Sequence, residues 1–308
     1  MKLVKSVLSA SILAAAAQSA VAVEITPYAG IQVEYQFDDQ GGRHDDGGID
    51  DSYSRVGIKA SEEFEGFAVN YKFETGVDAT GEGDNKILDD GTVRVNRIQV
   101  TGDFGTIAYG LDWTPFYNEI DWGTGSDRFL GYYSGFQTQY PIRSSETLFY
   151  TSPDLNGLKV SMSYGQDSTS CYDGTSCAND KELVLTYTVN ENLTVVAANT
   201  DGDADSQKRN GFGLRYTVDA WTFTLNNQDA DTGLEHTNAY VGYALSDADY
   251  IGAHISESTA SDADGNTKTN PFTLGYSHKY NDALTVFAEY YDNDAGGEYP
   301  QVGVHYNF

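Results

Sequence analysis

The stretch Phe212-Gly-Leu-Arg-Tyr-Thr-Val218, joined through Asp219-Ala220 to Trp221-Thr-Phe-Thr-Leu225, decides the fold class of this 308-residue chain. In each half every second residue is apolar, and the residues between are Gly, Arg or Thr. Because successive side chains of a strand point to opposite faces, this period of two indicates strands with one apolar and one polar face. The two-residue connection predicts an antiparallel hairpin.

The same alternation recurs along the rest of the chain. Seven short turns alternate strictly with eight longer, mostly acidic gaps, which makes fifteen connections and therefore sixteen strands. An even number of antiparallel strands, with short turns on one side and long loops on the other, is typical of a transmembrane barrel. Closure is expected because an open sheet edge is not stable in lipid. The expected strands are 29–37, 55–60, 67–73, 93–101, 107–111, 147–152, 158–166, 182–189, 193–200, 210–218, 221–229, 236–245, 250–258, 271–280, 284–292 and 299–308.

The mean hydropathy of −0.45 does not argue against a membrane barrel. Only every second residue of a barrel strand faces lipid, so the average looks soluble while one face is apolar. The 23 Tyr residues suit the aromatic girdles of such barrels. A soluble β-sandwich or β-helix would also show alternation. A sandwich, however, needs two sheets whose apolar faces meet, and sixteen strands with one set of short turns argue against that arrangement. An eight-stranded barrel would be filled by side chains, whereas sixteen strands enclose a water channel.

The first residues have the organisation of an export signal. Lys2 and Lys5 precede an apolar run at 7–17 and the small residues Ala20-Val21-Ala22. We expect residues 1–22 to be a signal peptide and residues 23–308 to be the barrel domain. The apolar run is too short to span a bilayer, which takes about 20 residues.

The acidic residues dominate the charge of the exported chain. Removing Lys2 and Lys5 leaves 16 basic and 46 acidic residues, hence a net charge of about −30. Nucleic acid is excluded as a partner because phosphate binding needs a basic face. Much of the acid lies in the gaps 38–51, 78–90 and 201–205. These carboxylates form either a solvated surface or sites at which divalent cations bridge to outer-membrane lipid and lipopolysaccharide.

Cys171 and Cys177 are the only cysteines. In an exported protein the expectation is a disulfide between them, which would constrain the unfolded chain by roughly 2 kcal/mol. No His or further Cys lies nearby in sequence, so metal ligation is the weaker interpretation. We expect no metal and no cofactor.

An enzymatic role is not expected. Catalytic barrels need a nucleophile or paired acids beside a histidine, and no histidine here lies near a serine in a recognisable motif. The five histidines are scattered over different strands and loops, at His44, His236, His254, His278 and His305.

Several short motifs, in this order along the chain, carry a family resemblance. They are Ser54-Arg55-Val56-Gly57-Ile58-Lys59, Asn96-Arg97, Gly102-Asp103-Phe104-Gly105-Thr106, Tyr109-Gly110, Thr114-Pro115-Phe116-Tyr117 and Tyr306-Asn307-Phe308. With these motifs the chain resembles the Gram-negative general porins over essentially its whole mature length. The resemblance implies an outer-membrane channel for small hydrophilic solutes and ions, assembled as a homotrimer.

The resemblance also assigns roles to particular segments. The stretch 113–146 matches the third extracellular loop, which folds into the lumen as a constriction, and the gap 79–91 matches the loop that latches onto a neighbouring subunit. The alternate residues Val304, Tyr306 and Phe308 resemble the terminal signal that the barrel-assembly machinery reads.

The constriction of these porins opposes loop carboxylates to basic residues on the facing wall. Because the alternation slips between Val95 and Ile98, a bulge is expected there, and whether Arg97 or Arg94 takes the second basic position stays open. The predicted constriction residues are Arg55, Arg97, Asp112, Glu119, Asp121 and Asp127.

Three departures from the family thin the basic side. Gly30, Leu111 and Thr151 stand where the family often has a basic residue. A narrow lumen screens its charges less than the open surface does, so this imbalance predicts a cation-preferring pore. Four further cations are expected to line the lumen: Lys59, Lys72, Lys159 and Arg215.

The aromatic residues of the loop leave one alternative open. They either stack on sugar rings, as in an oligosaccharide-selective porin, or pack the loop against the barrel, and packing is favoured. They are Trp113, Trp122, Tyr132, Tyr133 and Phe136.

Overall fold

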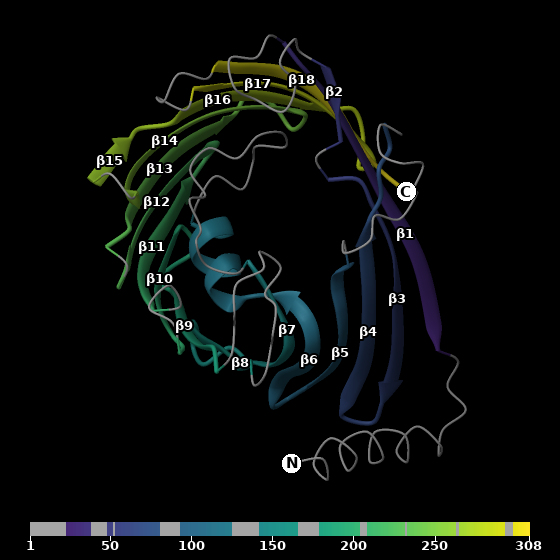
Figure 1. Cartoon of the computed structure of the whole chain (residues 1–308). Helices are drawn as coiled ribbons and strands as arrows, with labels where there is room; N and C mark the ends of the chain where they lie inside the picture. Colours follow the sequence, from purple (N-terminus) through teal and green to yellow (C-terminus); the bar gives the residue numbers. More distant parts are fainter. Residues whose placement is uncertain are drawn as a thin grey trace.

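The computed structural model describes residues 23–37, 48–51, 53–80, 93–124, 142–165, 179–203, 208–231, 233–262, 265–292 and 298–308. These residues form one antiparallel sheet curled into a barrel (Figure 1). Its strands are β1 Glu24–Gln36, β2 Gly48–Asp50, β3 Arg55–Phe64, β4 Phe67–Gly76, β5 Val93–Gly102, β6 Gly105–Trp113, β7 Arg143–Thr151, β8 Leu158–Gly165, β9 Lys181–Thr188, β10 Leu193–Asp201, β11 Arg209–Val218, β12 Trp221–Ala230, β13 Glu235–Ala244, β14 Asp249–Asp262, β15 Gly265–Thr269, β16 Phe272–Lys279, β17 Leu284–Asp292 and β18 Glu298–Asn307.

These eighteen strands make a barrel of sixteen, as predicted. β15 and β16 pair with β14 in one continuous register, so together they form one barrel strand interrupted at residues 270–271. β2 and β3 pair in succession along β1 and form another, interrupted at residues 51–54. The sheet closes because β1 pairs on its other side with β18, where Gly30 lies opposite Asn307 and Gln36 opposite Gln301.

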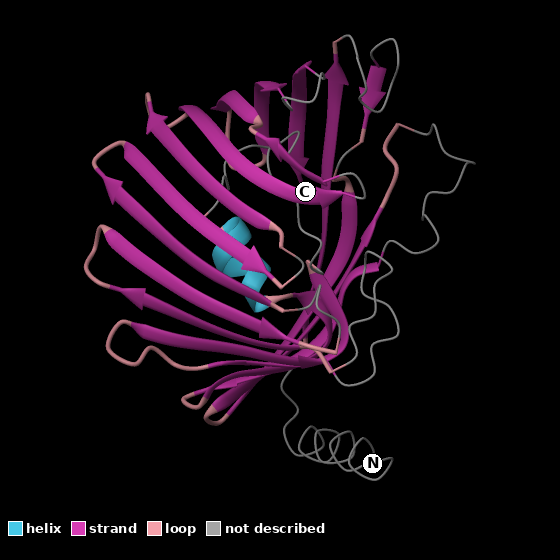
Figure 2. Ribbon diagram, turned by 60° about the vertical axis from the view of Figure 1, so that its left-hand side comes forward, coloured by secondary structure: helices cyan, strands magenta, loops and turns pink. Residues whose placement is uncertain are grey.

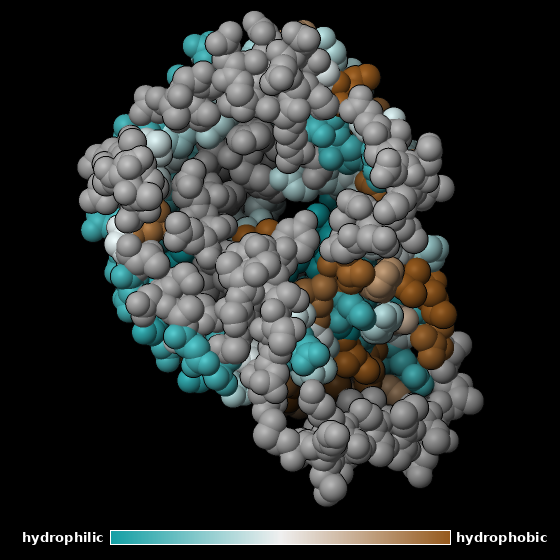
Figure 3. Space-filling view, viewed as in Figure 1, coloured by the Kyte–Doolittle hydropathy of each residue, from teal (hydrophilic) through white to brown (hydrophobic). Residues whose placement is uncertain are grey.

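The two faces of each strand follow the predicted alternation. On β12, Thr222, Thr224 and Gln228 are buried inside the barrel, while Trp221 and Phe223 stay 43% and 38% exposed on the outside. Figure 3 shows apolar residues gathered over β1, β3 and β4. A polar inside and an apolar outside are the reverse of a soluble protein, which is what lipid around the barrel requires.

No helix in the described part of the chain has the length and apolar character needed to cross a bilayer.

Two irregularities shift the register near the predicted constriction. One lies between Glu74 and Thr75, opposite Arg94, close to where the alternation predicts a bulge. The other lies between Gly110 and Asp112, next to the chain's departure from the wall. The predicted signal peptide and the pair Cys171 and Cys177 lie outside the described residues.

Candidate functional site

A short helix inside the barrel follows β6 and forms one side of the site. It is η1, Tyr117–Trp122, and Figure 2 shows it within the cylinder of strands. Pro115 stands at the start of the helical segment, where its missing N–H costs nothing. The N–H of Asn118 donates to the carbonyl of Thr114 over 3.0 Å. Of the 113–146 stretch, the helical segment with η1 thus lies inside the barrel, whereas residues 143–146 belong to the wall strand β7.

An apolar cluster holds this helical segment against one wall. Phe116 and Ile120 are fully buried against Val184 of β9 and Val196 and Ala198 of β10. These three wall residues lie at inward positions, where most of the barrel is polar. The helix therefore packs on a small hydrophobic surface inside a lumen whose lining is otherwise mostly polar.

Polar contacts on either side complete the attachment. The N–H of Phe116 donates to Glu182 Oε2 over 2.7 Å, and Asn226 Nδ2 donates to the carbonyl of Ile120 over 3.0 Å. Arg215 donates to the carbonyl of Gly123 over 3.2 Å. Backbone groups of the helical segment thereby gain hydrogen-bond partners on the wall.

Two glycines of β11 leave the space that the helix occupies. A Cβ built on Gly211 would lie 2.8 Å from Phe116 Cζ, and one on Gly213 would overlap the side chain of Thr124. Neither separation is one that real Cβ atoms adopt. Gly211 and Gly213 are therefore required for close approach, a signal that the sequence carries but that its alternation pattern does not explain.

Two of the predicted loop carboxylates point into this wall instead of across the lumen. Asp121 is 1% exposed and accepts a hydrogen bond from Gln228 of β12, and Glu119 accepts one from Thr186 of β9 over 3.0 Å. Burial raises the pKa of Asp121 to about 7. The expectation that Glu119 and Asp121 oppose Arg55 and Arg97 is therefore corrected: the polar inner wall supplies donors that the open lumen lacks. Asp127 lies outside the described residues.

The other side of the site is the wall formed by β3, β4 and β5, whose centre is Glu74. This carboxylate is 4% exposed and lies 3.1 Å from Lys72 Nζ, 3.1 Å from Arg94 Nε and 3.9 Å from Arg55 Nε. Tyr28 also donates to it over 2.9 Å. One acid thus holds three cations together, and Arg55 reaches the lumen as predicted.

Arg94 and Arg97, the two candidates for the second basic position, both face the lumen. The register shift at Glu74 places Arg94 in the bulge, while Arg97 Nε lies 2.7 Å from Asp112 Oδ2. Asp112 is on the lumen side, as predicted, but it neutralises Arg97 beside it and does not face it across the pore.

A cavity of about 330 Å³ lies between the helical segment and the β3–β5 wall. Its lining combines charged and polar residues of the barrel with aromatic residues of the loop: Gln32, Tyr53, Arg55, Glu74, Arg94 and His305 from the barrel, and Trp113, Tyr117, Asn118 and Trp122 from β6 and the loop. Trp113 stacks on Tyr117 with ring centroids 4.9 Å apart, and the guanidinium of Arg143 lies 4.5 Å from the Trp113 ring. These contacts give Trp113 a packing role, as the sequence favoured. Tyr132, Tyr133 and Phe136 lie outside the described residues.

A row of cations crosses the same wall nearer the short turns. Lys59 of β3 lies directly opposite Lys72 of β4, which lies directly opposite Arg97 of β5. The sequence treats Lys59 and Lys72 only as general lumen lining. Their position next to one another depends on the register between neighbouring strands, which the alternation of apolar and polar residues does not give.

The last strand presents its alternate apolar residues to the outside. Val304, Tyr306 and Phe308 are 37%, 38% and 73% exposed, and the rings of Tyr306 and Phe308 meet edge to face at 4.6 Å. The three side chains are therefore accessible on the outer face of β18. Their role as an assembly signal stays a prediction.

Comparison with known proteins shows the family to which this barrel belongs. A family model described as Gram-negative porin matches residues 6–298. The chain belongs to the Gram-negative porin family. It is therefore a β-barrel channel of the Gram-negative outer membrane, not an enzyme, and proteins of this family are typically trimers.

Solved structures share the fold of this porin at low sequence identity. An anion-selective porin from Comamonas acidovorans aligns with a TM-score of 0.72 at 16% identity, covering 93% of this chain and all of that one. OmpF of Salmonella typhi, in complex with daunomycin, aligns with a TM-score of 0.71 at 15% identity, covering 93% and 97%. OmpT of Vibrio cholerae aligns with a TM-score of 0.68 at 17% identity, covering 94% and 99%.

A curated relative shows closer sequence similarity over a shorter span. A chitoporin of Vibrio furnissii is 30% identical over 170 residues. That match covers 49% of this chain and 45% of the chitoporin, so it spans about half the length of the relative.

Proposed function

We propose that this porin is a general diffusion channel for small hydrophilic solutes and ions. The observation that carries the proposal is the cavity between η1 and the β3–β5 wall, which charged and aromatic side chains line together. Loop and wall narrow the lumen there, and side chains of both signs line the gap. Such a lining stabilises water and passing polar solutes without a dedicated binding pocket.

The second part of this proposal is that the channel prefers cations. We expect the preference to be weaker than the sequence alone suggests. The net charge of about −30 supports it, because much of that charge lies in the long gaps between the strands of the sequence. Lys59, Lys72 and Arg97 on the wall act in the opposite sense, and Asp121 is turned away from the lumen. We therefore infer a weak cation preference that originates in the acidic loops.

An oligosaccharide channel is the second candidate. Two observations favour it: the chitoporin relative, and the placement of Trp113, Tyr117 and Trp122 on the cavity between loop and wall. Aromatic faces are suited to stacking on sugar rings. The stacking and cation contacts of Trp113 count against it, because they occupy the faces that a sugar would need.

The remaining parts of the proposal concern processing and assembly. They are removal of residues 1–22, a Cys171–Cys177 disulfide, assembly by the barrel machinery through Val304, Tyr306 and Phe308, and a homotrimer. The narrow zone would be lined by Arg55, with the pair of Arg97 and Asp112 at its periplasmic edge and Asp127 as the remaining candidate on the loop.

Single-channel recording in a planar bilayer under a KCl gradient tests the proposal. The expected result is large conductance steps that close in thirds and a small reversal potential of the cationic sign. A reversal potential of the anionic sign would contradict the cation preference, and silent membranes would contradict the open channel. Saturable block by low concentrations of chitin oligosaccharides would favour the second candidate.

A further inference from the structure

Three cations lie side by side on the periplasmic half of the β3–β5 wall. Lys59, Lys72 and Arg97 occupy directly opposite positions on three neighbouring strands. Like charges placed directly opposite in an antiparallel sheet destabilise it. The short turns at 65–66 and 103–104 close these strands on the periplasmic side, so the row lies between those turns and the constriction.

The charges of this row are only partly compensated. Lys72 Nζ lies 3.1 Å from Glu74 and Arg97 Nε lies 2.7 Å from Asp112. In the part of the chain that the structure describes, Lys59 forms no ion pair, and its ammonium lies 5.0 Å from the centre of the Tyr28 ring. Arg55 and Arg94 also pair with Glu74, so four cations share Glu74 and Asp112 and Lys59 pairs with neither.

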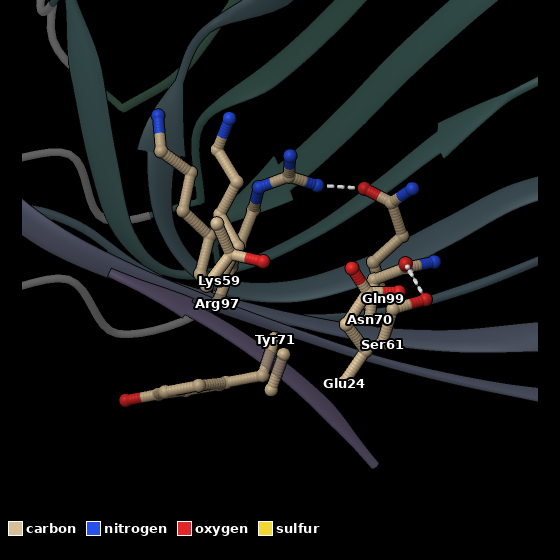
Figure 4. Close-up of a pocket in the computed structure, with 10 residues that line it drawn as sticks. Glu24, Lys59, Ser61, Asn70, Tyr71, Arg97 and Gln99 are labelled. Atoms are coloured by element: carbon tan, nitrogen blue, oxygen red, sulfur yellow. Dashed lines mark hydrogen bonds between the residues drawn. The ribbon is translucent and has the colours of Figure 1, made fainter. Parts of the chain in front are cut away.

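A cavity of about 380 Å³ opens over the row. Besides the three cations it is lined by hydroxyl and amide groups, of which Ser61 donates to Asn70 over 3.0 Å and Gln99 accepts from Arg97. Glu24 is the one carboxylate in its lining. Figure 4 shows Lys59 and Arg97 extending to the same side of the sheet, with Tyr71 on the opposite side.

We propose that this cavity binds small dianions, either dicarboxylates or phosphate esters, on the periplasmic side of the constriction. Residues directly opposite on neighbouring antiparallel strands have Cβ atoms about 5 Å apart, which lets two cations reach two anionic groups of one small solute. Arg97 offers a planar fork for paired oxygens, and each lysine offers a point charge. A dianion would also relieve the repulsion within the row.

This inference rests on the proposed open channel, because the solute reaches the cavity only through the lumen. The inference goes beyond an open channel because it predicts a binding site. A basic wall that acts only through its electric field would attract monoanions and dianions without saturation. A site built from adjacent cations saturates and discriminates by charge. Those two properties separate binding from general attraction.

Block of single-channel potassium current tests the site. Malonate and inorganic phosphate are added separately to the periplasmic side of the reconstituted porin, with acetate as the monoanion. The expected result is saturable, voltage-dependent block by both dianions, at a concentration at least tenfold below any effect of acetate. Block by phosphate alone would restrict the site to phosphate esters, and block by malonate alone would restrict it to dicarboxylates.

Two variants locate the site on the wall. Lys59→Gln and Lys72→Gln should each weaken dianion block about fivefold, the scale of one partly screened charge contact. Lys159→Gln, which removes a lumen cation from β8 near another short turn, should change the block less than twofold. Lys59→Gln should also raise resistance to denaturant, because one member of a repelling row is removed. If Lys59 only stabilised the fold, Lys59→Gln would lower the resistance to denaturant.

Three results would overturn the inference. One is a conducting channel without saturable dianion block, which leaves the general-channel proposal standing. The second is an equal loss of block in Lys59→Gln and Lys159→Gln, which would assign the effect to the overall field. The third, a silent bilayer, would overturn both proposals together.

Discussion

The two walls that face each other across the lumen have the same strand pattern but different inner surfaces. On β9–β12 small or apolar inward residues, such as Gly211, Gly213 and Val184, leave room for η1, and the charged Glu182 and Arg215 bond to the backbone of the helical segment. On β3–β5 they are long and charged, such as Arg55, Lys59 and Arg97, and a cavity remains. The wall that receives the loop is therefore the one with small inward side chains and with charged side chains that bond to the backbone of the loop. Desolvating the cations of β3–β5 under a packed helix would cost more than burying glycine and valine.

The largest expected effect tests the charged wall. Glu74→Gln leaves Arg55, Lys72 and Arg94 without their shared carboxylate, and we expect a loss of about 2–3 kcal/mol in the free energy of unfolding. The measurement is denaturant unfolding in detergent micelles. Asp112→Asn is the control, because its side chain is more exposed and pairs with one cation, and it should cost less. An equal loss in both variants would contradict a central role for Glu74.

The second effect tests the wall that carries the loop. Gly213→Ala places a Cβ against Thr124 and should lift η1 from β11, at a cost of about 2 kcal/mol by overpacking. Frequent brief closures of the channel are the expected readout. Adding Thr124→Gly removes the opposing side chain and should restore steady current. Failure of this double variant to recover would show that Gly213 matters for another reason.

The third effect is a pH dependence at Asp121. Its folded pKa of about 7 is raised above the ordinary 3.8, so the seated loop favours the protonated carboxyl. The resulting stabilisation is full below about pH 4 and is lost as the pH rises through 7. Channel closures should therefore become more frequent between pH 5.5 and 8.5. Asp121→Asn keeps an acceptor for Gln228 and should abolish this trend; an unchanged trend in that variant would assign it to another group.

The smallest effect concerns the aromatic residues between the walls. If Trp113 packs the loop, Trp113→Leu should leave the permeation rate of small sugars within about twofold of the wild type, because an apolar filler is retained. Liposome swelling with sugars of graded size measures this. Trp122→Leu serves as the matched variant on the cavity surface. A tenfold loss of oligosaccharide block in either variant would favour a sugar-binding channel.

The sequence by itself determined the architecture, because the information is local. Alternation along segments such as Trp221–Ala230 assigns each residue to the lipid or the lumen face, and the alternation of short turns with long gaps yields sixteen barrel strands. The short motifs point correctly to the porin family. Inward placement of Arg55 follows from the same period of two, whereas Asp112 and its neighbour Trp113 both lie inside the barrel, next to the register shift at Gly110.

Only the tertiary structure decided how the lumen is built, because those features join residues far apart in sequence. Glu119 and Asp121 face their own wall because Thr186 and Gln228, on β9 and β12, supply the donors. The juxtaposition of Lys59, Lys72 and Arg97 follows from strand register, which is set by pairing over whole strands and not by the alternation of any one of them.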